Sequence, residues 1–201
     1  MPEKLTSFGV HKSVEIFRCP VSGEILSGIV FSANGMYMTA RHVVDNRQDI
    51  LPGFEVFPVY DEREVDFAIK KDASLSGMEL GFNGERVLEN CVCLTSRDDD
   101  PENIILVKGT YAPFYAPTYL YEFIPDDNEQ RSLFDSGCSG SAVIYGGHVV
   151  GLIKASNEDQ SIVVGLCFNH VELRKLLADH FGLDFREIPE QEEGSQGDPK
   201  T

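Results

Sequence analysis

FDSGCSGSAVIYGGHVVG, residues 134–151, is the most informative stretch of this 201-residue sequence. It predicts a tight turn rich in glycine and serine, then a strand, a Gly-Gly hairpin at residues 146–147 and a returning strand. Gly137 and Gly140 allow backbone conformations that other residues avoid, which leaves room for a molecule to approach the Ser139 hydroxyl. A serine on such a loop is a candidate nucleophile if a histidine and a carboxylate can reach it.

The sequence supplies candidates for both partners. His42 lies in TARHVV, residues 39–44, on a turn that follows a predicted strand. A histidine there can accept a serine proton, because imidazole side chains titrate near neutral pH. Asp66 lies in VDFAI, residues 65–69, as a lone acid at the head of an apolar strand, where a buried carboxylate needs a partner such as an imidazole N–H. The neighbouring acids lack the F-A-I sequence that follows Asp66; they are Asp61, Glu62, Glu64 and Asp72.

The rest of the chain predicts many short strands with turn signals between them, followed by one helix. The helix is expected from His170 to about His180, because Asn169 can cap it and apolar residues recur there at helical spacing. This pattern favours an all-β barrel or sandwich with a C-terminal helix. Besides the two strands of the first motif, strands are predicted over residues 12–18, 25–32, 36–39, 54–60, 64–70, 87–95, 104–111, 119–124 and 162–168.

Four segments describe the predicted domain organisation. Residues 1–11 are expected to form an extended or frayed lead-in, and residues 12–185 a folded domain. The polar stretch 72–86 is a plausible crossing between two halves of this domain. Residues 186–201 carry five acids against two bases and predict a disordered acidic tail.

Composition limits the class of protein. Lys and Arg number 17 and Asp and Glu 33, so the net charge is 17 − 33 = −16, which argues against nucleic acid and anionic membranes as partners. No apolar segment resembles a signal peptide or a membrane span. The odd number of cysteines, five, predicts free thiols in a reducing compartment, so a cytoplasmic location is expected.

The order His, Asp, Ser, in the motifs TARHVV, VDFAI and GCSGSA, resembles the chymotrypsin-fold (trypsin-like) serine peptidases. The pattern is most similar to the protease domain of the HtrA/Deg family, without a PDZ domain. The similarity extends to GLCFN, residues 165–169, and spans about residues 12–182. It implies a fold of two six-stranded antiparallel β-barrels with a C-terminal helix and the active site between the barrels.

The resemblance also implies residue roles. His42 would be the general base, Asp66 would orient it and Ser139 would attack the peptide bond to form an acyl-enzyme. The N–H groups of Gly137 and Ser139 would form the oxyanion hole. Phe134 and Ser136 would line the pocket for the substrate side chain, within a wall formed by residues 132–136. The strand that pairs with the substrate backbone would be Lys154, Ala155 and Ser156.

Several features depart from the family pattern. Secreted relatives carry an aspartate where this sequence has Cys138, so activation by a newly cut N-terminus is not expected. Cys138 also suggests an alternative, since viral relatives use a cysteine nucleophile; a buried thiol is the favoured interpretation. No acid stands where a pocket for Arg or Lys would need it. Two interpretations of Lys154 stay open, namely attraction of an acidic substrate residue or a solvated side chain.

The sequence therefore predicts a serine endopeptidase that needs neither metal nor cofactor and acts on a protein or peptide substrate. The alternative is a catalytically dormant or pseudo-protease module that binds peptides and is gated by a regulatory protein partner. His148 and His170 are expected to be structural. Cys91 and Cys93, two apart on one strand, are expected to pack in the core rather than bind metal, since no second ligand pair has zinc spacing.

Overall fold

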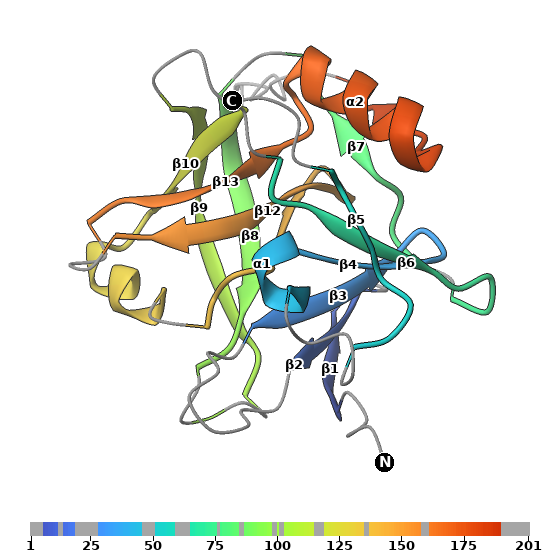
Figure 1. The fold of residues 1–201 in the computed structure, drawn as a ribbon. Coiled ribbons are helices and arrows are strands. Elements are labelled where there is room, and N and C mark those ends of the chain that lie inside the picture. The colour runs from blue at the N-terminus through green and yellow to red at the C-terminus, as the bar shows by residue number, and fades with distance from the viewer. Residues whose placement is uncertain are drawn as a thin grey trace, which may run out of the picture.

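The computed structural model shows a β-rich molecule with two halves that lie side by side (Figure 1). The structure describes residues 6–11, 14–18, 28–45, 51–58, 65–75, 77–84, 87–97, 100, 103–114, 119–134, 137–157 and 161–189.

The N-terminal half is a six-stranded antiparallel sheet. Its strand order is β1-β2-β3-β4-β6-β5. Asn34 and Gly35 join β3 to β4 with φ of 50° and 72°, which is the two-residue turn that the Asn-Gly sequence predicts. The expected lead-in contributes β1, which pairs with β2. The strands are β1 (Thr6–His11), β2 (Val14–Arg18), β3 (Ile29–Ala33), β4 (Met36–Thr39), β5 (Glu55–Val56) and β6 (Ala68–Lys71).

The C-terminal half is a closed antiparallel barrel with the order β10-β13-β12-β11-β8-β9. Tyr111 fills its interior, and its hydroxyl donates to the carbonyl oxygen of Leu166 at 2.9 Å. Gly165 makes room for this ring, because a Cβ there would lie 2.4 Å from the Tyr111 hydroxyl. The strands are β8 (Leu88–Thr95), β9 (Ile105–Pro113), β10 (Leu120–Pro125), β11 (Ala142–Tyr145), β12 (His148–Ser156) and β13 (Val163–Cys167).

The all-β class and the C-terminal helix are therefore confirmed. Closure is seen in the C-terminal barrel, whereas the N-terminal six strands form a sheet in which β1 and β5 do not pair with each other within the described ranges. Each half has the six strands that were predicted, but the strand pairing does not show that the N-terminal half is closed. The chain passes from sheet to barrel between β6 and β8.

Four short elements complete the fold. They are helix α1 (Arg41–Val44), strand β7 (Gly81–Phe82), the 3-10 helix η1 (Asn128–Leu133) and strand β14 (Arg186–Glu187). Pairing of β14 with β7 corrects the prediction that the disordered tail begins at Arg186. The Ile188 N–H donates to the Phe82 carbonyl oxygen at 2.8 Å, and the Ile188 side chain is buried against the barrel core. Burial of this apolar residue, together with the backbone hydrogen bonds of Arg186 and Ile188, holds the segment. The tail after Pro189 lies outside the described residues.

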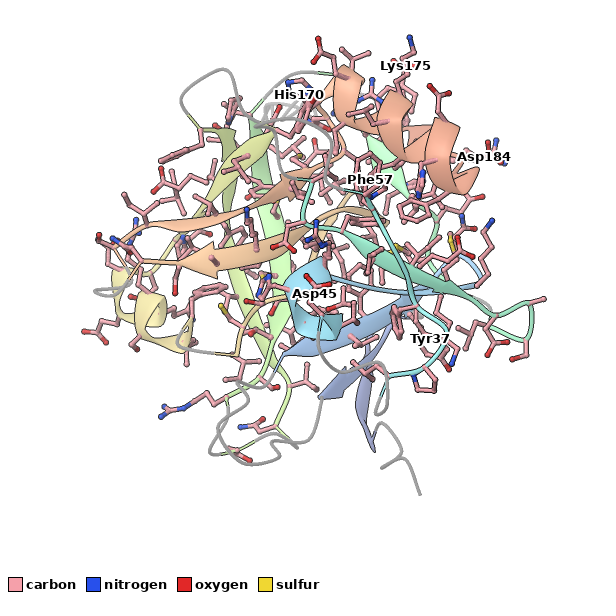
Figure 2. All side chains as sticks on the ribbon, in the orientation of Figure 1. Tyr37, Asp45, Phe57, His170, Lys175 and Asp184 are labelled. Carbon is pink, nitrogen blue, oxygen red and sulfur yellow. The ribbon has the colours of Figure 1, made fainter. Side chains whose placement is uncertain are left out.

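Helix α2 (Val171–Phe181) covers the N-terminal half, above β5 and β6 in Figure 1. Phe181 lies 5.9 Å from the ring of Phe67 and 6.0 Å from the ring of Phe57; Figure 2 shows Phe57 beneath the helix. The helix ends at Gly182, whose φ of 69° is the left-handed conformation that glycine adopts without strain. No helix within the described ranges is long and apolar enough to cross a membrane.

Removal of the Phe181 ring should destabilise the fold, because this side chain is 2% exposed and joins the helix to the sheet. Phe181→Ala is expected to lower the free energy of unfolding by about 3–5 kcal/mol. Val171→Ala, on the same helix, should change it by less than about 0.5 kcal/mol, because Val171 is 53% exposed. Urea denaturation of both variants measures the difference, and equal losses would contradict the packing described.

Candidate active site

Helix α1 presents His42 to solvent. Val43 and Val44 on this single turn are buried and fix it against the sheet. Gly28 makes the close approach possible, since a Cβ there would lie 2.6 Å from the Val43 methyl groups. His42 is left with 48% of its side chain exposed, so its ring is fixed through its neighbours and yet accessible to a substrate.

Asp66 is held in the core beside this histidine. It lies between Val65 and Phe67, which are both buried, and its side chain is 3% exposed. The His42 backbone N–H donates to Asp66 Oδ1 at 2.9 Å, and His42 Nδ1 lies 2.6 Å from Oδ2. Because an ionised carboxylate only accepts hydrogen bonds, Nδ1 carries a proton, and in the neutral imidazole this leaves Nε2 as the acceptor.

The Asp66 carboxylate stays ionised in this environment. Burial raises the pKa of Asp66, but the hydrogen bonds and charge of His42, with a smaller effect of the Lys154 charge, outweigh burial and bring the pKa below its ordinary value. An anion at this position favours the protonated imidazole that a general base becomes after it takes a proton. The pair His42–Asp66 predicted from the sequence is thus formed.

Ser139 lies on a loop with extensive backbone hydrogen bonding. The Ile29 N–H donates to the Ser139 carbonyl oxygen, and the Gly140 N–H to the Ile153 carbonyl oxygen, each at 2.8 Å. Both the N–H and the hydroxyl of Ser141 donate to the Cys138 carbonyl oxygen, at 3.0 and 2.6 Å. Gly140 has a φ of 92°. The loop is therefore fixed to both halves of the molecule.

The Ser139 hydroxyl donates to the Lys154 carbonyl oxygen at 2.8 Å. Within the described ranges no hydrogen bond joins this hydroxyl to His42. Lys154 lies at an irregularity in the β12–β13 pairing, between Ile153 and Ala155, and its charge acts on Asp66. The structure therefore relates Lys154 to Ser139 through its carbonyl and to Asp66 through its charge. The sequence pattern gave no signal for either relation.

The Cys138 side chain lies in the barrel core, whereas the Ser139 hydroxyl is directed to the Lys154 carbonyl oxygen. Its residue surface is 2% exposed and belongs to the barrel core, together with Cys93 and Cys167. A thiol buried among apolar side chains is poorly suited to nucleophilic attack, because reactive cysteines need exposure and an ionised thiolate. The buried-thiol interpretation of Cys138 is confirmed.

The remaining predicted binding residues lie on the loop before Ser139 and at the end of β12. Gly137 is buried and has a φ of 106°, Phe134 is 0% exposed, and Ser136 lies outside the described residues. Lys154, Ala155 and Ser156 are half-buried at the end of β12. The Ser156 hydroxyl donates to the Phe134 carbonyl oxygen at 2.6 Å. Their roles toward a substrate stay predictions.

His148, His170, Cys91 and Cys93 have structural surroundings. His148 Nδ1 lies 3.0 Å from the Gly146 carbonyl oxygen, and His170, at the start of α2 in Figure 2, stacks edge-on against Tyr119. Cys91 and Cys93 lie in the barrel core, as predicted, and burial raises the pKa of Cys91 to about 12. No cluster of three or more metal-binding side chains occurs within the described part of the chain.

Comparison with known proteins agrees on the fold. No protein-family model and no curated protein sequence matches the chain. Among solved structures, Deg5 is similar with a TM-score of 0.54 and 16% identity over 85% of this chain and 90% of that one. The Rv3671c protease from M. tuberculosis in its active form is similar with a TM-score of 0.54 and 19% identity, over 83% of this chain and 80% of that one. Kallikrein-related peptidase 10 in complex with Zn²⁺ is similar with a TM-score of 0.59 and 11% identity, over 85% of this chain and 95% of that one.

These neighbours are chymotrypsin-fold proteases, and the chain has the chymotrypsin-like fold. At such identities the similarity defines the architecture alone. The chemistry must therefore be argued from the chain's own residues.

Asp66 should make the stability pH-dependent in acid. Because the pKa of Asp66 is below its ordinary value of 3.8, the unfolded chain binds this proton more tightly than the folded chain. Its stabilising contribution is present above pH about 4 and is lost as the pH falls through the lower folded-state pKa. As the pH falls from about 5 to about 2, the free energy of unfolding should therefore decrease more steeply for the wild type than for Asp66→Asn. The difference between the two slopes should correspond to up to about one bound proton.

The control is Asp184→Asn, at an exposed carboxylate on the periphery of the molecule (Figure 2). It should leave the wild-type slope unchanged. Identical slopes for the wild type and Asp66→Asn would show that the carboxylate is not stabilised as described.

Gly140 should not tolerate a side chain. A Cβ at Gly140 would lie 1.9 Å from the Ile29 carbonyl oxygen, whereas one at Gly147, also left-handed at φ 77°, would meet nothing within 4 Å. Gly147→Ala should lower the free energy of unfolding by about 1 kcal/mol, because alanine is strained in this backbone conformation. Gly140→Ala should lower it by at least about 2 kcal/mol more, because either β3 or the Ser139 loop must shift. Thermal or urea unfolding measures both. Similar losses for the two variants would contradict the close contact.

Proposed function

We propose that this protein is a serine endopeptidase that hydrolyses peptide bonds through His42, Asp66 and Ser139. The observation that carries the proposal is the His42–Asp66 pair, joined at 2.9 and 2.6 Å through two separate groups of His42. This pair lies in a chymotrypsin-like fold with Ser139 on a glycine-bracketed loop. A carboxylate, an oriented imidazole and an accessible serine are the three groups that acyl transfer requires.

In the proposed reaction, His42 Nε2 takes the Ser139 hydroxyl proton as Oγ attacks the carbonyl carbon of the substrate. The N–H groups of Gly137 and Ser139 stabilise the oxyanion, and the imidazolium returns its proton to the leaving amine. Water, deprotonated by His42, then hydrolyses the acyl-enzyme and releases the second product. Asp66 keeps the imidazole in the required tautomer throughout and remains ionised.

The hydrogen bond from Ser139 to the Lys154 carbonyl oxygen favours the second candidate, a dormant peptide-binding module gated by a partner. The small free energy of this hydrogen bond argues for the first candidate, the serine endopeptidase. A neutral hydrogen bond contributes about 1 kcal/mol net, so rotation of the hydroxyl toward His42 costs about fivefold in population. A loss of this size slows an enzyme slightly and does not abolish its activity. The proposed substrate is a protein or peptide, and a gating protein partner belongs to the second candidate.

A cytoplasmic location is part of the proposal. The four cysteines that lie within the described residues are free thiols, which is compatible with a reducing compartment.

Serine-directed labelling tests the proposal. A fluorophosphonate should attach to Ser139 in the wild-type protein, as located by mass spectrometry and peptide mapping. Ser139→Ala should lose the adduct and reduce peptide hydrolysis by about 10⁴- to 10⁶-fold, with unchanged folding.

The matched control is Cys138→Ala, at the adjacent residue, which should retain both labelling and hydrolysis because that thiol faces the core. A folded wild-type protein without an adduct would support the dormant module. Loss of activity in Cys138→Ala with retention in Ser139→Ala would overturn the serine assignment.

A further inference from the structure

The carbonyl oxygen of Cys138 accepts two hydrogen bonds from one residue, Ser141. The Ser141 N–H donates to it at 3.0 Å and the Ser141 hydroxyl at 2.6 Å. The N–H alone closes a four-residue turn, with a positive φ at Gly140 that this kind of turn favours. The hydroxyl is therefore a second donor on a turn that is already closed, and Ser141 is 0% exposed, so water does not replace it.

A second buried hydroxyl stands behind Ser141. Ser141 Oγ lies 3.0 Å from Thr95 Oγ1, and Thr95 is also 0% exposed. A hydroxyl has a single hydrogen and a carbonyl oxygen only accepts. The Ser141 hydrogen is therefore given to Cys138, and the Thr95 hydroxyl donates to Ser141 Oγ. Thr95 ends β8 and is paired with Ile105 of β9. A chain of hydrogen bonds thus runs in one direction from the barrel to the Cys138 carbonyl oxygen.

The Cys138–Ser139 peptide group carries the effect of this chain to the candidate site. A trans peptide group is planar, and its C=O and N–H point in opposite directions. Because the carbonyl oxygen is directed at Ser141, the Ser139 N–H is directed away from Ser141 and Thr95. Within the described ranges this N–H donates to no protein group. It is therefore available to an oxygen atom of a substrate that is bound at the candidate nucleophile.

Aligned hydrogen bonds strengthen one another in a buried environment. Each donor polarises the next group along the chain, by about 10–30% per bond. A carbonyl oxygen that accepts hydrogen bonds carries more negative charge, which leaves the N–H at the other edge of the same peptide group more positive. An N–H of this kind stabilises an oxyanion more strongly when the charge develops in the transition state.

We propose that Ser141 and Thr95 are positioning residues for the oxyanion hole, because their hydroxyls orient and polarise the Cys138–Ser139 peptide group so that the Ser139 N–H meets the oxygen of the scissile carbonyl. The proposal rests on the proposed function and adds two residues to it. Both side chains are buried and act through the peptide group rather than on the substrate. Thr95 acts only through Ser141, so the two hydroxyls act in series.

The test measures the second-order rate constant at which a fluorophosphonate labels Ser139, with the adduct counted by mass spectrometry. Ser139 Oγ bonds to phosphorus, the P–F bond breaks, fluoride leaves and His42 takes the hydroxyl proton. The phosphoryl oxygen gains negative charge in this step and needs the same N–H donors as a substrate carbonyl oxygen. Ser141→Ala should slow labelling about three- to tenfold. This is less than the loss of about 10²-fold for a whole donor, because the Ser139 N–H remains.

Variants at Thr95 separate the hydroxyl from the volume of the side chain. Thr95→Val keeps the shape and removes the hydroxyl, so it should slow labelling about two- to threefold. Thr95→Ser keeps the hydroxyl and should retain the wild-type rate. The double variant Ser141→Ala/Thr95→Val should be labelled at the rate of Ser141→Ala, because groups that act in series are not additive.

Ile188→Ala is the control for a general loss of stability. Ile188 is 4% exposed and packs in the barrel core from the C-terminal segment. This variant should be less stable than the wild type and should still be labelled at the wild-type rate. All rates are measured under conditions in which each variant is folded, and the two Thr95 variants decide the outcome if Ser141→Ala does not fold.

The outcomes separate the two levels of the proposal. Suppose that the wild-type protein is labelled at Ser139, but that Ser141→Ala is labelled equally fast or that Thr95→Ser slows labelling as much as Thr95→Val. The positioning role is then wrong and the proposed function stands. The same conclusion follows if the losses of the single variants multiply in the double variant. If the folded wild-type protein is not labelled, both proposals are wrong.

Discussion

The contact between Gly140 and the Ile29 carbonyl group joins the two halves of the molecule at the candidate site. The Ile29 N–H donates to the Ser139 carbonyl oxygen, while the Ile29 carbonyl oxygen accepts from the Thr39 hydroxyl at 2.8 Å. Thr39 ends β4 and stands three residues before His42. One residue of β3 therefore fixes both the loop of the serine and the strand that leads to the histidine. Glycine is required because the backbones approach too closely for any Cβ.

Asp66 completes this arrangement from the same sheet. It lies two residues before the start of β6, which pairs with β4 through Thr39–Ala68. The register of this strand pair brings the carboxylate to the histidine, and burial without such a partner would cost several kcal/mol for a charge. The hydrogen-bonded pair of His42 and Asp66 is thus a consequence of strand pairing, which places Asp66 at this position.

The sequence predicted those features that depend on local pattern. The Asn-Gly turn, the turn that carries His42, the apolar strand after Asp66 and the amphipathic helix α2 each carry a signal within a few residues. The sequence carried no such signal for β14, because this strand is two residues long and depends on the burial of Ile188, which lies outside it. The closure of the C-terminal barrel depends on long-range strand pairing, which a single sequence does not encode in a readable form.

The partners of individual polar groups were also beyond the sequence. The Ser139 hydroxyl has several staggered orientations, and these differ by about one hydrogen bond in free energy. Its partner, the Lys154 carbonyl oxygen, is a backbone group whose position depends on an irregularity in the β12–β13 pairing, so the identity of residue 154 gave no hint of it. The motif predicts which residue is the nucleophile, while the resting orientation of its hydroxyl follows from the barrel.

The choice between Cys138 and Ser139 shows how the barrel determines chemistry. The two residues are adjacent, and the thiol is the better nucleophile in isolation. The turn that Ser141 closes onto the Cys138 carbonyl oxygen sends the two side chains in different directions, one into the barrel core and one toward Lys154. Exchange of their directions would place a polar hydroxyl among apolar side chains and remove an apolar thiol from them, which costs free energy on both counts. The packing of the barrel therefore supports the serine as the nucleophile of the proposed peptidase, although the cysteine is the more reactive group.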